Sequence, residues 1–265
     1  MTLLRADTVA KSYGGRRILS AATLRAEAGQ FRVLFGRNGS GKSTLLKIAC
    51  GRVAPDGGSV HFDGQVFLTA HHADLAARGL FYLPDHDLLS RAYTVRQQLE
   101  LFRVQFDGGD VVEAAERVGI AAHLDKRPSQ LSGGELRRAE LAAVLVRRPR
   151  CLLADEPYRG ISPTDAETLT SVLRSLAASG TAVLITGHEV PTLLEAADHI
   201  TWCTHGTTYE LGSPTVALTH DAFRREYLGS MRQETMFSDE RERARTSANR
   251  PPRAKDLSAR PPITF

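Results

Sequence analysis

Short apolar runs recur along the chain and predict a buried sheet. Four of them are nearly continuous, at Val33–Phe35, Leu80–Leu83, Cys151–Ala154 and Thr181–Ile185. Uninterrupted apolar runs of this length are typical of strands that are buried on both faces, as in parallel sheets. Further short strands are predicted at residues 3–9, 22–26 and 60–62.

Helical patterns lie between these runs. Ser162-Pro163 combines a capping side chain with proline at the first helical position, which predicts a helix to about Ala178. Because this helix separates two buried strands, the segment predicts a strand–helix–strand unit of a parallel sheet and an α/β fold. Apolar residues at helical spacing predict other helices over 95–106, 111–118 and 135–147.

The end of the chain differs in composition from the rest. The whole chain is 42% apolar and 24% charged, as in an ordinary globular protein. From Met231 to Phe265, eight Lys/Arg and five Asp/Glu accompany several prolines and few large apolar residues. We therefore expect a folded domain over residues 1–230 and a disordered, basic, proline-containing tail over 231–265.

Charge and hydropathy argue against several classes of protein. Most of the net charge of +4 lies in the tail, so the folded part gives no reason to expect nucleic acid as a partner. No apolar run has the length of a membrane span, and the N-terminus lacks the apolar core of a signal peptide. We expect a cytoplasmic protein that can lie on the cytosolic face of the membrane.

A glycine-rich loop follows the run at Val33–Phe35. Gly36, Gly41, Lys42 and Ser43 match the pattern G-x-x-x-x-G-K-[ST], with a predicted strand before it and a predicted helix after it. Glycines let backbone N–H groups approach phosphate oxygens, Lys42 adds a positive charge, and the Ser43 hydroxyl can reach Mg²⁺. The loop therefore predicts a site for a nucleoside triphosphate with Mg²⁺.

Polar residues follow two other predicted strands. Asp155 and Glu156 come directly after Cys151–Ala154, at the strand end where α/β sheets bind ligands. We expect Asp155 to hold Mg²⁺ through water, and Glu156 to orient or deprotonate the attacking water. His188 follows the next strand, and we expect it to contact the γ-phosphate.

With these motifs in order, residues 3–230 resemble the ATP-binding subunits of ABC transporters. GRNGSGKS is similar to their Walker A motif, CLLADEP to Walker B, LSGGE to the signature motif, and TGH to the H-switch. The resemblance implies an α/β P-loop NTPase fold of ABC type: a mixed core sheet with an antiparallel β subdomain and a helical subdomain at about 86–148. It also implies that Tyr13 stacks on adenine.

The same resemblance implies a transport-coupled ATPase with ATP and Mg²⁺ as ligands. In this family the signature loop faces the γ-phosphate held by another subunit, so Ser132 and Gly134 would donate hydrogen bonds across a dimer of identical or homologous chains. A separate transmembrane permease subunit is the other implied partner. Lys42, Glu156 and His188 would be catalytic. The implied nucleotide contacts are Tyr13, Gly36, Arg37, Asn38, Gly39, Ser40, Gly41, Lys42, Ser43, Thr44, Ser132, Gly133, Gly134 and Glu135.

Two positions depart from the family pattern. The family usually has glutamine after Leu-Pro, where this chain has Asp85, and Leu-Asp after the glycine that is Gly160 here, where this chain has Ile161-Ser162. Asp85 still offers oxygen to Mg²⁺, so the metal candidates are Ser43, Asp155 and Asp85. We expect these changes to affect coupling and turnover more than ATP binding.

Other functions stay open at this level. One is a soluble ABC-type ATPase that acts on ribosomes or DNA, although the chain has one P-loop and no cysteine clusters. Another is a weakly active regulatory subunit of a heterodimer, suggested by Asp85 and Ser162. Within the transporter group, Glu210–Pro214 and Arg224–Gly229 are similar to the branched-chain amino acid and lipopolysaccharide-export ATPases. The cargo and its direction are not encoded in these motifs.

Overall fold

The computed structural model describes residues 1–188 and 190–229, and the tail predicted over 231–265 lies outside the described residues. The chain separates into two units, residues 1–220 and residues 221–265. In the described part of the second unit, a helical turn (α9, Asp221–Phe223) continues into a π-helix (Arg224–Leu228), and the rings of Phe223 and Tyr227 stack with centroids 5.4 Å apart.

The first unit is built on a ten-stranded mixed sheet with the order β5-β4-β1-β2-β10-β9-β3-β8-β7-β6. The five strands from β9 to β6 run parallel, and every residue of β3, β6, β7 and β8 is buried. This burial on both faces explains why their sequences read as continuous apolar runs. The parallel strands are β3 (Phe31–Phe35), β6 (Leu80–Leu83), β7 (Cys151–Ala154), β8 (Ala182–Thr186) and β9 (His199–Thr204).

The other half of the sheet is antiparallel. The long strands β1 and β2 form a hairpin, β4 and β5 extend its outer edge, and β10 pairs antiparallel with β9. A single parallel residue pair, Thr207 with Ala21, joins β10 to β2 and so connects the two halves. These strands are β1 (Thr2–Tyr13), β2 (Arg16–Glu27), β4 (Gly57–Phe62), β5 (Gln65–Phe67) and β10 (Thr207–Gly212).

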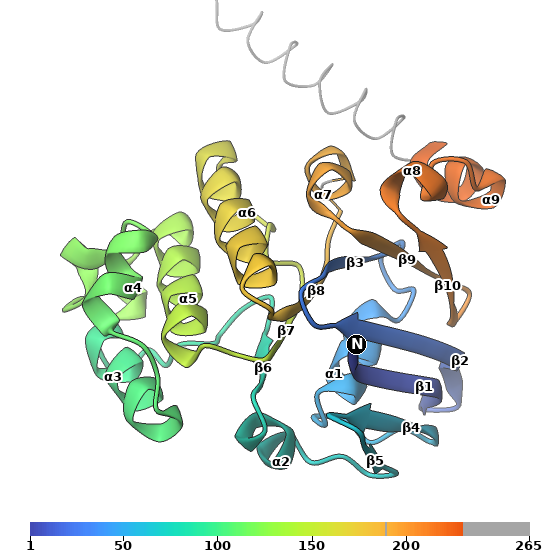
Figure 1. Ribbon diagram of the computed structural model, residues 1–265, viewed down its shortest axis with the longest axis horizontal. Helices are drawn as coiled ribbons and strands as arrows, with labels where there is room; N and C mark the ends of the chain where they lie inside the picture. The colour runs from blue at the N-terminus through green and yellow to red at the C-terminus, as the bar shows by residue number, and fades with distance from the viewer. Residues whose placement is uncertain (189, 230–265) are drawn as a thin grey trace, which may run out of the picture. The chain divides into compact units, whose positions relative to one another are not determined.

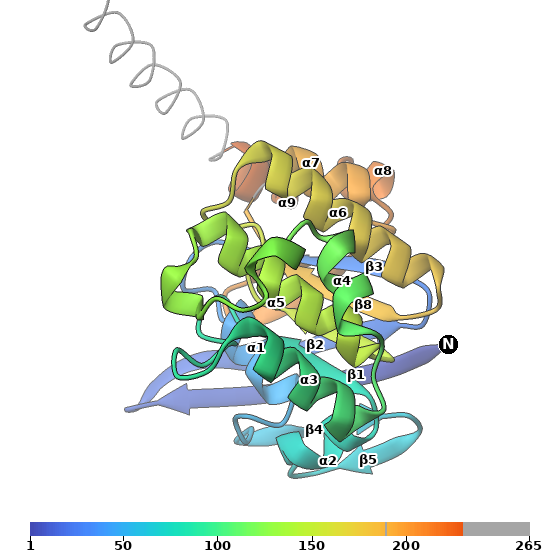
Figure 2. The same ribbon diagram turned by 90° about the vertical axis from the view of Figure 1, so that its left-hand side faces the viewer.

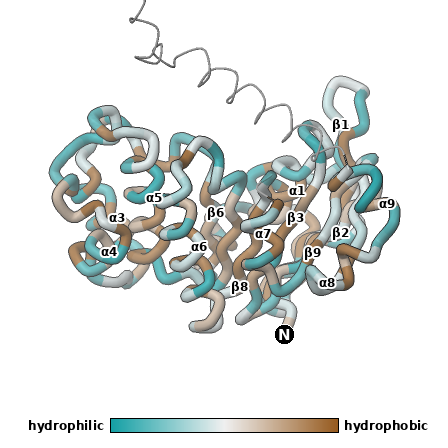
Figure 3. The backbone as a smooth tube through the Cα atoms, turned by 90° about the horizontal axis from the view of Figure 1, so that it is seen from above, coloured by the Kyte–Doolittle hydropathy of each residue, from teal (hydrophilic) through white to brown (hydrophobic). Residues whose placement is uncertain are grey.

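Helices cover the sheet and form a separate cluster at one end (Figures 1 and 2). Helix α1 packs against β1 and β2, whereas α6 packs against β3 and β8. Helices α3, α4 and α5 pack on one another, beyond β6 and α6 in Figure 3. The bounds are α1 (Lys42–Ala49), α2 (His72–Ala77), α3 (Val95–Phe106), α4 (Val111–Arg117), α5 (Gly133–Arg147), α6 (Pro163–Ala178), α7 (Val190–Ala196) and α8 (Pro214–Ala217), with 3-10 turns at Ala121–His123 and Pro128–Gln130.

The sheet and helices confirm the predicted fold class. The predicted ranges of β6, β7, α3 and α6 agree with the structure, and β7–α6–β8 is the expected parallel strand–helix–strand unit. The hairpin strands β1 and β2 are longer than expected because their added residues, 10–13 and 16–21, are mostly half-buried or exposed and carry little apolar signal. None of the described helices has the length and apolar character that a bilayer crossing requires.

Candidate active site

The glycine-rich loop joins β3 to α1 and is closely packed at its two ends. A side chain at Gly36 would collide with the backbone carbonyl of Cys203, and Gly41, the residue that caps α1, has a φ of +103° that favours glycine. Lys42 begins the helix, and its Nζ donates to the carbonyl oxygens of Gly36 at 2.7 Å and Arg37 at 3.2 Å. The lysine therefore folds back over the loop that it follows.

Lys42 is a buried cation, with 5% of its surface exposed. Burial lowers the pKa of its ammonium group, and the negative potential of Glu156, Cys203 and Asp155 partly offsets that effect. In this structure the partners of the ammonium group are backbone carbonyls. An anion such as a phosphate group would supply the full opposite charge that these dipoles lack.

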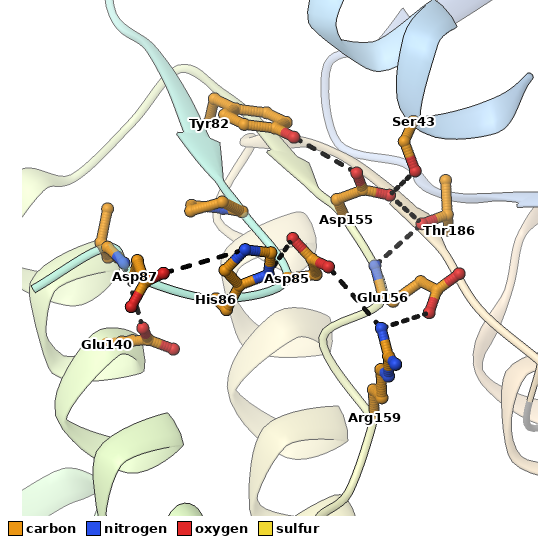
Figure 4. A network of polar contacts seen from close by, with 12 residues as sticks. Ser43, Tyr82, Asp85, His86, Asp87, Glu140, Asp155, Glu156, Arg159 and Thr186 are labelled. Atoms are coloured by element: carbon orange, nitrogen blue, oxygen red, sulfur yellow. Dashed lines mark hydrogen bonds and ion pairs between the residues drawn. The ribbon is translucent and has the colours of Figure 1, made fainter.

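Asp155 follows β7 and is 2% exposed, and its carboxylate is held by three hydroxyl donors (Figure 4). Oδ1 accepts from Ser43 Oγ at 3.1 Å and from Thr186 Oγ1 at 2.8 Å, and Oδ2 accepts from the Tyr82 hydroxyl at 3.2 Å. Burial and the charge of Asp155 raise the pKa of the Tyr82 hydroxyl, so this hydroxyl keeps its proton and donates it to the hydrogen bond with Asp155. Four elements thus converge on one carboxylate, and the roles of Tyr82 and Thr186 were not predicted.

Glu156 and His188 meet beside this carboxylate. Glu156 has a φ of +45°, and its backbone N–H donates to Thr186 Oγ1 at 2.8 Å. Its Oε1 lies 3.1 Å from Nε2 of His188. An opening of about 380 Å³ is lined by Asn38, Glu156, Arg159 and His188. The structure therefore brings the glycine-rich loop, the glutamate and the histidine to one opening.

Asp85 lies apart from the Asp155 carboxylate. Its Oδ1 is 2.8 Å from Nδ1 of His86, and its Oδ2 is 3.7 Å from Nη1 of Arg159 (Figure 4). The backbone carbonyl of Asp85 accepts from Nη2 of Arg137 at 2.6 Å, which ties the loop after β6 to helix α5. Metal coordination by Asp85 stays a prediction, and the contact with Arg159 was not predicted because Arg159 belongs to no motif.

The LSGGE segment caps helix α5. The hydroxyl of Ser132 accepts from the backbone N–H of Glu135 at 3.3 Å, and Oε2 of Glu135 accepts from the backbone N–H of Ser132 at 2.7 Å. These reciprocal bonds form a capping box. Ser132 and Gly133 are exposed, whereas a side chain at Gly134 would collide with the carboxylate of Asp165.

Asp165 links the signature helix to the start of α6. It forms an ion pair with Arg138 of α5 and accepts a hydrogen bond from the Ser162 hydroxyl at 2.7 Å. The bond from Ser162, with the charge of Arg138, lowers the pKa of Asp165. Ser162 also caps α6, as expected. The chain thus has a carboxylate three residues after the position where the family pattern has one.

The remaining candidates lie at the surface or on the loop. Tyr13 ends β1 with 49% of its surface exposed, and Lys11 Nζ lies 5.5 Å from the centre of its ring. An exposed ring here is accessible to a planar ligand, and adenine stacking stays a prediction. On the loop, Arg37, Asn38 and Gly39 are exposed, Thr44 is half-buried, and the Ser40 hydroxyl is buried without a hydrogen-bond partner.

A strand–loop–helix turn with a buried lysine, beside a buried aspartate at the end of a parallel strand, defines a P-loop nucleoside triphosphatase. The family model described as ABC transporter matches residues 19–159. The chain belongs to the ABC transporter family, and it is an ATP-binding ATPase of that family. The predicted family and enzyme class are confirmed.

Named relatives cover most of the chain. The lipopolysaccharide export system ATP-binding protein LptB of Haemophilus influenzae is 30% identical over 236 residues, which are 86% of this chain and 98% of that protein. The hemin import ATP-binding protein HmuV of Pseudomonas entomophila is 35% identical over 217 residues, or 78% of this chain and 85% of that protein.

Solved structures support the fold. An ATP-binding cassette of an ABC transporter in its ADP conformation has a TM-score of 0.75 and 23% identity, and the match covers 86% of this chain and 99% of that one. A dimeric bacterial ABC transporter cassette has a TM-score of 0.71 and 23% identity, over 79% of this chain and 99% of that one. At this identity the two matches establish the fold.

Proposed function

We propose that this protein is the ATP-hydrolysing subunit of an ABC transporter, which dimerises around ATP and powers movement of a substrate through a separate membrane subunit. The observation that carries this proposal is the opening where Asn38 of the glycine-rich loop, Glu156 and His188 meet. Such an opening offers a phosphate site, a base and a second polar group within reach of one another.

In the proposed reaction, Glu156 orients the water that attacks the γ-phosphate and takes up its proton. Its carboxylate is 19% exposed, so it can reach water while its backbone is fixed by Thr186. His188, 3.1 Å from the same carboxylate, holds Glu156 and contacts the γ-phosphate. Lys42 exchanges its carbonyl partners for phosphate oxygens, which compensate its buried charge more fully.

We also propose that Ser43 and Asp155 hold Mg²⁺. Ser43 Oγ and Asp155 Oδ1 lie 3.1 Å apart, and both are the hard oxygen donors that Mg²⁺ prefers. Among the residues that the structure describes, no group of three or more His, Cys, Asp or Glu could hold a metal ion. A site with few protein ligands suits Mg²⁺, which usually keeps several waters and binds substrate phosphates; when bound, it would offset phosphate charge.

The signature segment supports the proposal of a dimer. Ser132 and Gly133 are exposed at the N-terminus of a fifteen-residue helix, where backbone N–H groups favour an anion. The opening beside Glu156 is lined by other residues of the same chain. A second subunit, identical or homologous, would bring its γ-phosphate to Ser132, Gly134 and the helix end, so that ATP joins the two chains.

A groove beside the helical cluster is the proposed site for a membrane subunit. It has a volume of about 250 Å³ and lies between β6 and the helices α3 and α5. Phe81, Phe102 and Phe106 line it with Arg147, whose guanidinium lies 3.8 Å from the ring centre of Phe106. A groove lined by aromatic side chains suits a short amphipathic helix of a permease. The helical subdomain at about 86–148 is therefore proposed as the part that senses this partner.

The relatives do not agree on a cargo. One is named for lipopolysaccharide export and another for hemin import, which differ in substrate and in direction. In the proposed function the membrane subunit selects the cargo, and this chain supplies the ATPase cycle.

The test compares the purified protein with its Glu156→Gln variant. We expect wild type to hydrolyse ATP, and the variant to bind ATP but turn over about 100-fold or more slowly. In light-scattering measurements the variant should form a dimer with ATP and Mg²⁺, and a monomer with ADP as the control. A variant that hydrolyses ATP as fast as wild type would contradict the role of Glu156, and one that stays monomeric with ATP would contradict a homodimer.

A further inference from the structure

Charged side chains form a row from Glu156 to the loop after β6 (Figure 4). Nη1 of Arg159 lies 3.7 Å from Oδ2 of Asp85 and 4.0 Å from Oε2 of Glu156. On the far side, His86 contacts Oδ1 of Asp85 at 2.8 Å. One guanidinium group therefore stands between two carboxylates, slightly closer to Asp85 than to Glu156.

The backbone positions of this row are fixed by hydrogen bonds. The carbonyl of Asp85 is held by Arg137, and the backbone N–H of Glu156 by Thr186. The backbone N–H of Arg159 donates to the carbonyl of Glu156 at 3.1 Å in a tight turn. The Arg159 side chain, by contrast, is 70% exposed, whereas Asp85 is 26% and Glu156 19% exposed. The guanidinium is therefore the part that can shift between its two partners.

The two neighbours of Arg159 have different consequences for hydrolysis. A guanidinium that pairs closely with Glu156 would occupy the oxygens that must accept a proton from water. A carboxylate at position 85 with no cation beside it would add a negative charge near the place of the ATP phosphates. Asp85 therefore keeps Arg159 from blocking Glu156, and Arg159 offsets the negative charge that Asp85 adds near the phosphates.

We propose that Asp85 is a positioning residue that draws the guanidinium of Arg159 away from Glu156, while Arg159 cancels the charge of Asp85. The proposal rests on the proposed function, since it assigns roles around the same base. It also explains how this chain accommodates an aspartate where the family pattern has glutamine: the added charge is paired within the same chain.

Steady-state kinetics on three variants test the pair. Asp85→Asn releases Arg159 to Glu156, so kcat should fall about 10-fold while KM for ATP stays the same or falls. Arg159→Ala leaves two carboxylates near the phosphates, so KM should rise about 5-fold. The Kd of a fluorescent, non-hydrolysable ATP analogue should rise with it. The double variant should recover kcat to within about 3-fold of wild type, because it has neither a guanidinium that can pair with Glu156 nor a carboxylate at position 85.

A matched control is available next to the site. Arg91 is also exposed and pairs with a neighbouring aspartate, Asp87, at 3.8 Å, so Arg91→Ala should leave kcat, KM and Kd unchanged. If wild type hydrolyses ATP but the effects of the two single changes add in the double variant, the positioning role is wrong. A kcat loss in Asp85→Asn that Arg159→Ala does not relieve would overturn it too and would indicate direct metal contact by Asp85. Absence of hydrolysis by wild type would instead contradict the proposed function.

Discussion

Asp155 and Ser132 are both polar residues at the end of a regular element, yet their surroundings are opposite. Asp155 is 2% exposed, and its carboxylate accepts hydrogen bonds from Ser43, Tyr82 and Thr186 on three other elements. Ser132 is exposed, and it exchanges hydrogen bonds with Glu135 in the first turn of its own helix. The first region is tied together by distant parts of the chain, and the second is stabilised locally.

The contrast distinguishes the buried site at Asp155, which is assembled within one chain, from the helix end at Ser132, which is exposed at the surface. A buried carboxylate needs partners inside the protein, because an unpaired charge there is costly. A capped helix end needs none, so it can be presented to another molecule without loss of stability. The proposed dimer depends on this division, and each prediction below tests one side of it against the other.

The largest expected effect is on ATP turnover, when one residue of each region is substituted in turn. Lys42→Ala removes the buried cation and should abolish detectable binding of a fluorescent ATP analogue. Ser132→Asp keeps a good capping residue but places a negative charge where another subunit's phosphate would lie. Both changes should lower ATP turnover about 100-fold or more, but Ser132→Asp should leave affinity for the analogue and thermal stability unchanged.

Mixing these two inactive variants tests whether an ATP site is formed by one chain or is completed by the signature segment of a second chain. A mixed dimer holds one site with an intact loop from the Ser132→Asp chain and an intact signature segment from the Lys42→Ala chain. Turnover should therefore reappear in the mixture. If the mixture stays as inactive as its components, the signature segment does not complete a site across subunits.

A smaller effect is expected on folding in the buried region. Thr186→Val removes the donor to Asp155 and the acceptor for the backbone N–H of Glu156. Leaving these buried groups unpaired should lower the free energy of unfolding by about 2 kcal/mol. Urea denaturation measures this loss, with the exposed Thr164→Val as a control that should change little. Equal stability of both variants would show that Thr186 is not needed to hold the carboxylate.

The smallest effect is expected at the exposed cap. Ser132→Ala removes one capping hydrogen bond and should lower the free energy of unfolding by about 1 kcal/mol, which thermal or urea denaturation can measure. Ser162→Ala, at the cap of α6, is the matched change on the neighbouring helix. A larger loss for Ser132→Ala than for Thr186→Val would reverse the comparison between the two regions.

Much of the fold was predictable because its strongest signals are local. Continuous apolar runs marked β6 and β7, and the Ser162-Pro163 pair marked the start of α6. Helix α2 and strands β9 and β10 were not predicted. Strand β9 begins with a half-buried histidine and has a threonine among its buried residues, and Leu75 is the only buried side chain of α2, so neither element has a clear periodic pattern.

In the candidate site, too, residues in local motifs were predicted and partners distant in sequence were not. Motif residues such as Lys42, Asp155 and Glu156 were predicted from their motifs and from the apolar runs beside them, since residue type and short spacing are local signals, and their roles stay predictions. Tyr82 and Thr186 were missed because they reach Asp155 across 73 and 31 residues of sequence. Such partners are chosen by strand order in the sheet, which no local pattern encodes.

The sequence by itself determined the family, the phosphate-binding loop and the residues that carry the proposed chemistry, because each rests on residue type and short spacing. Tertiary structure alone decided which groups surround those residues. It paired Asp85 with Arg159 and set Arg159 between Asp85 and Glu156. The physical reason is that electrostatic interactions depend on distance in space, and the sheet brings the ends of β6 and β7 side by side.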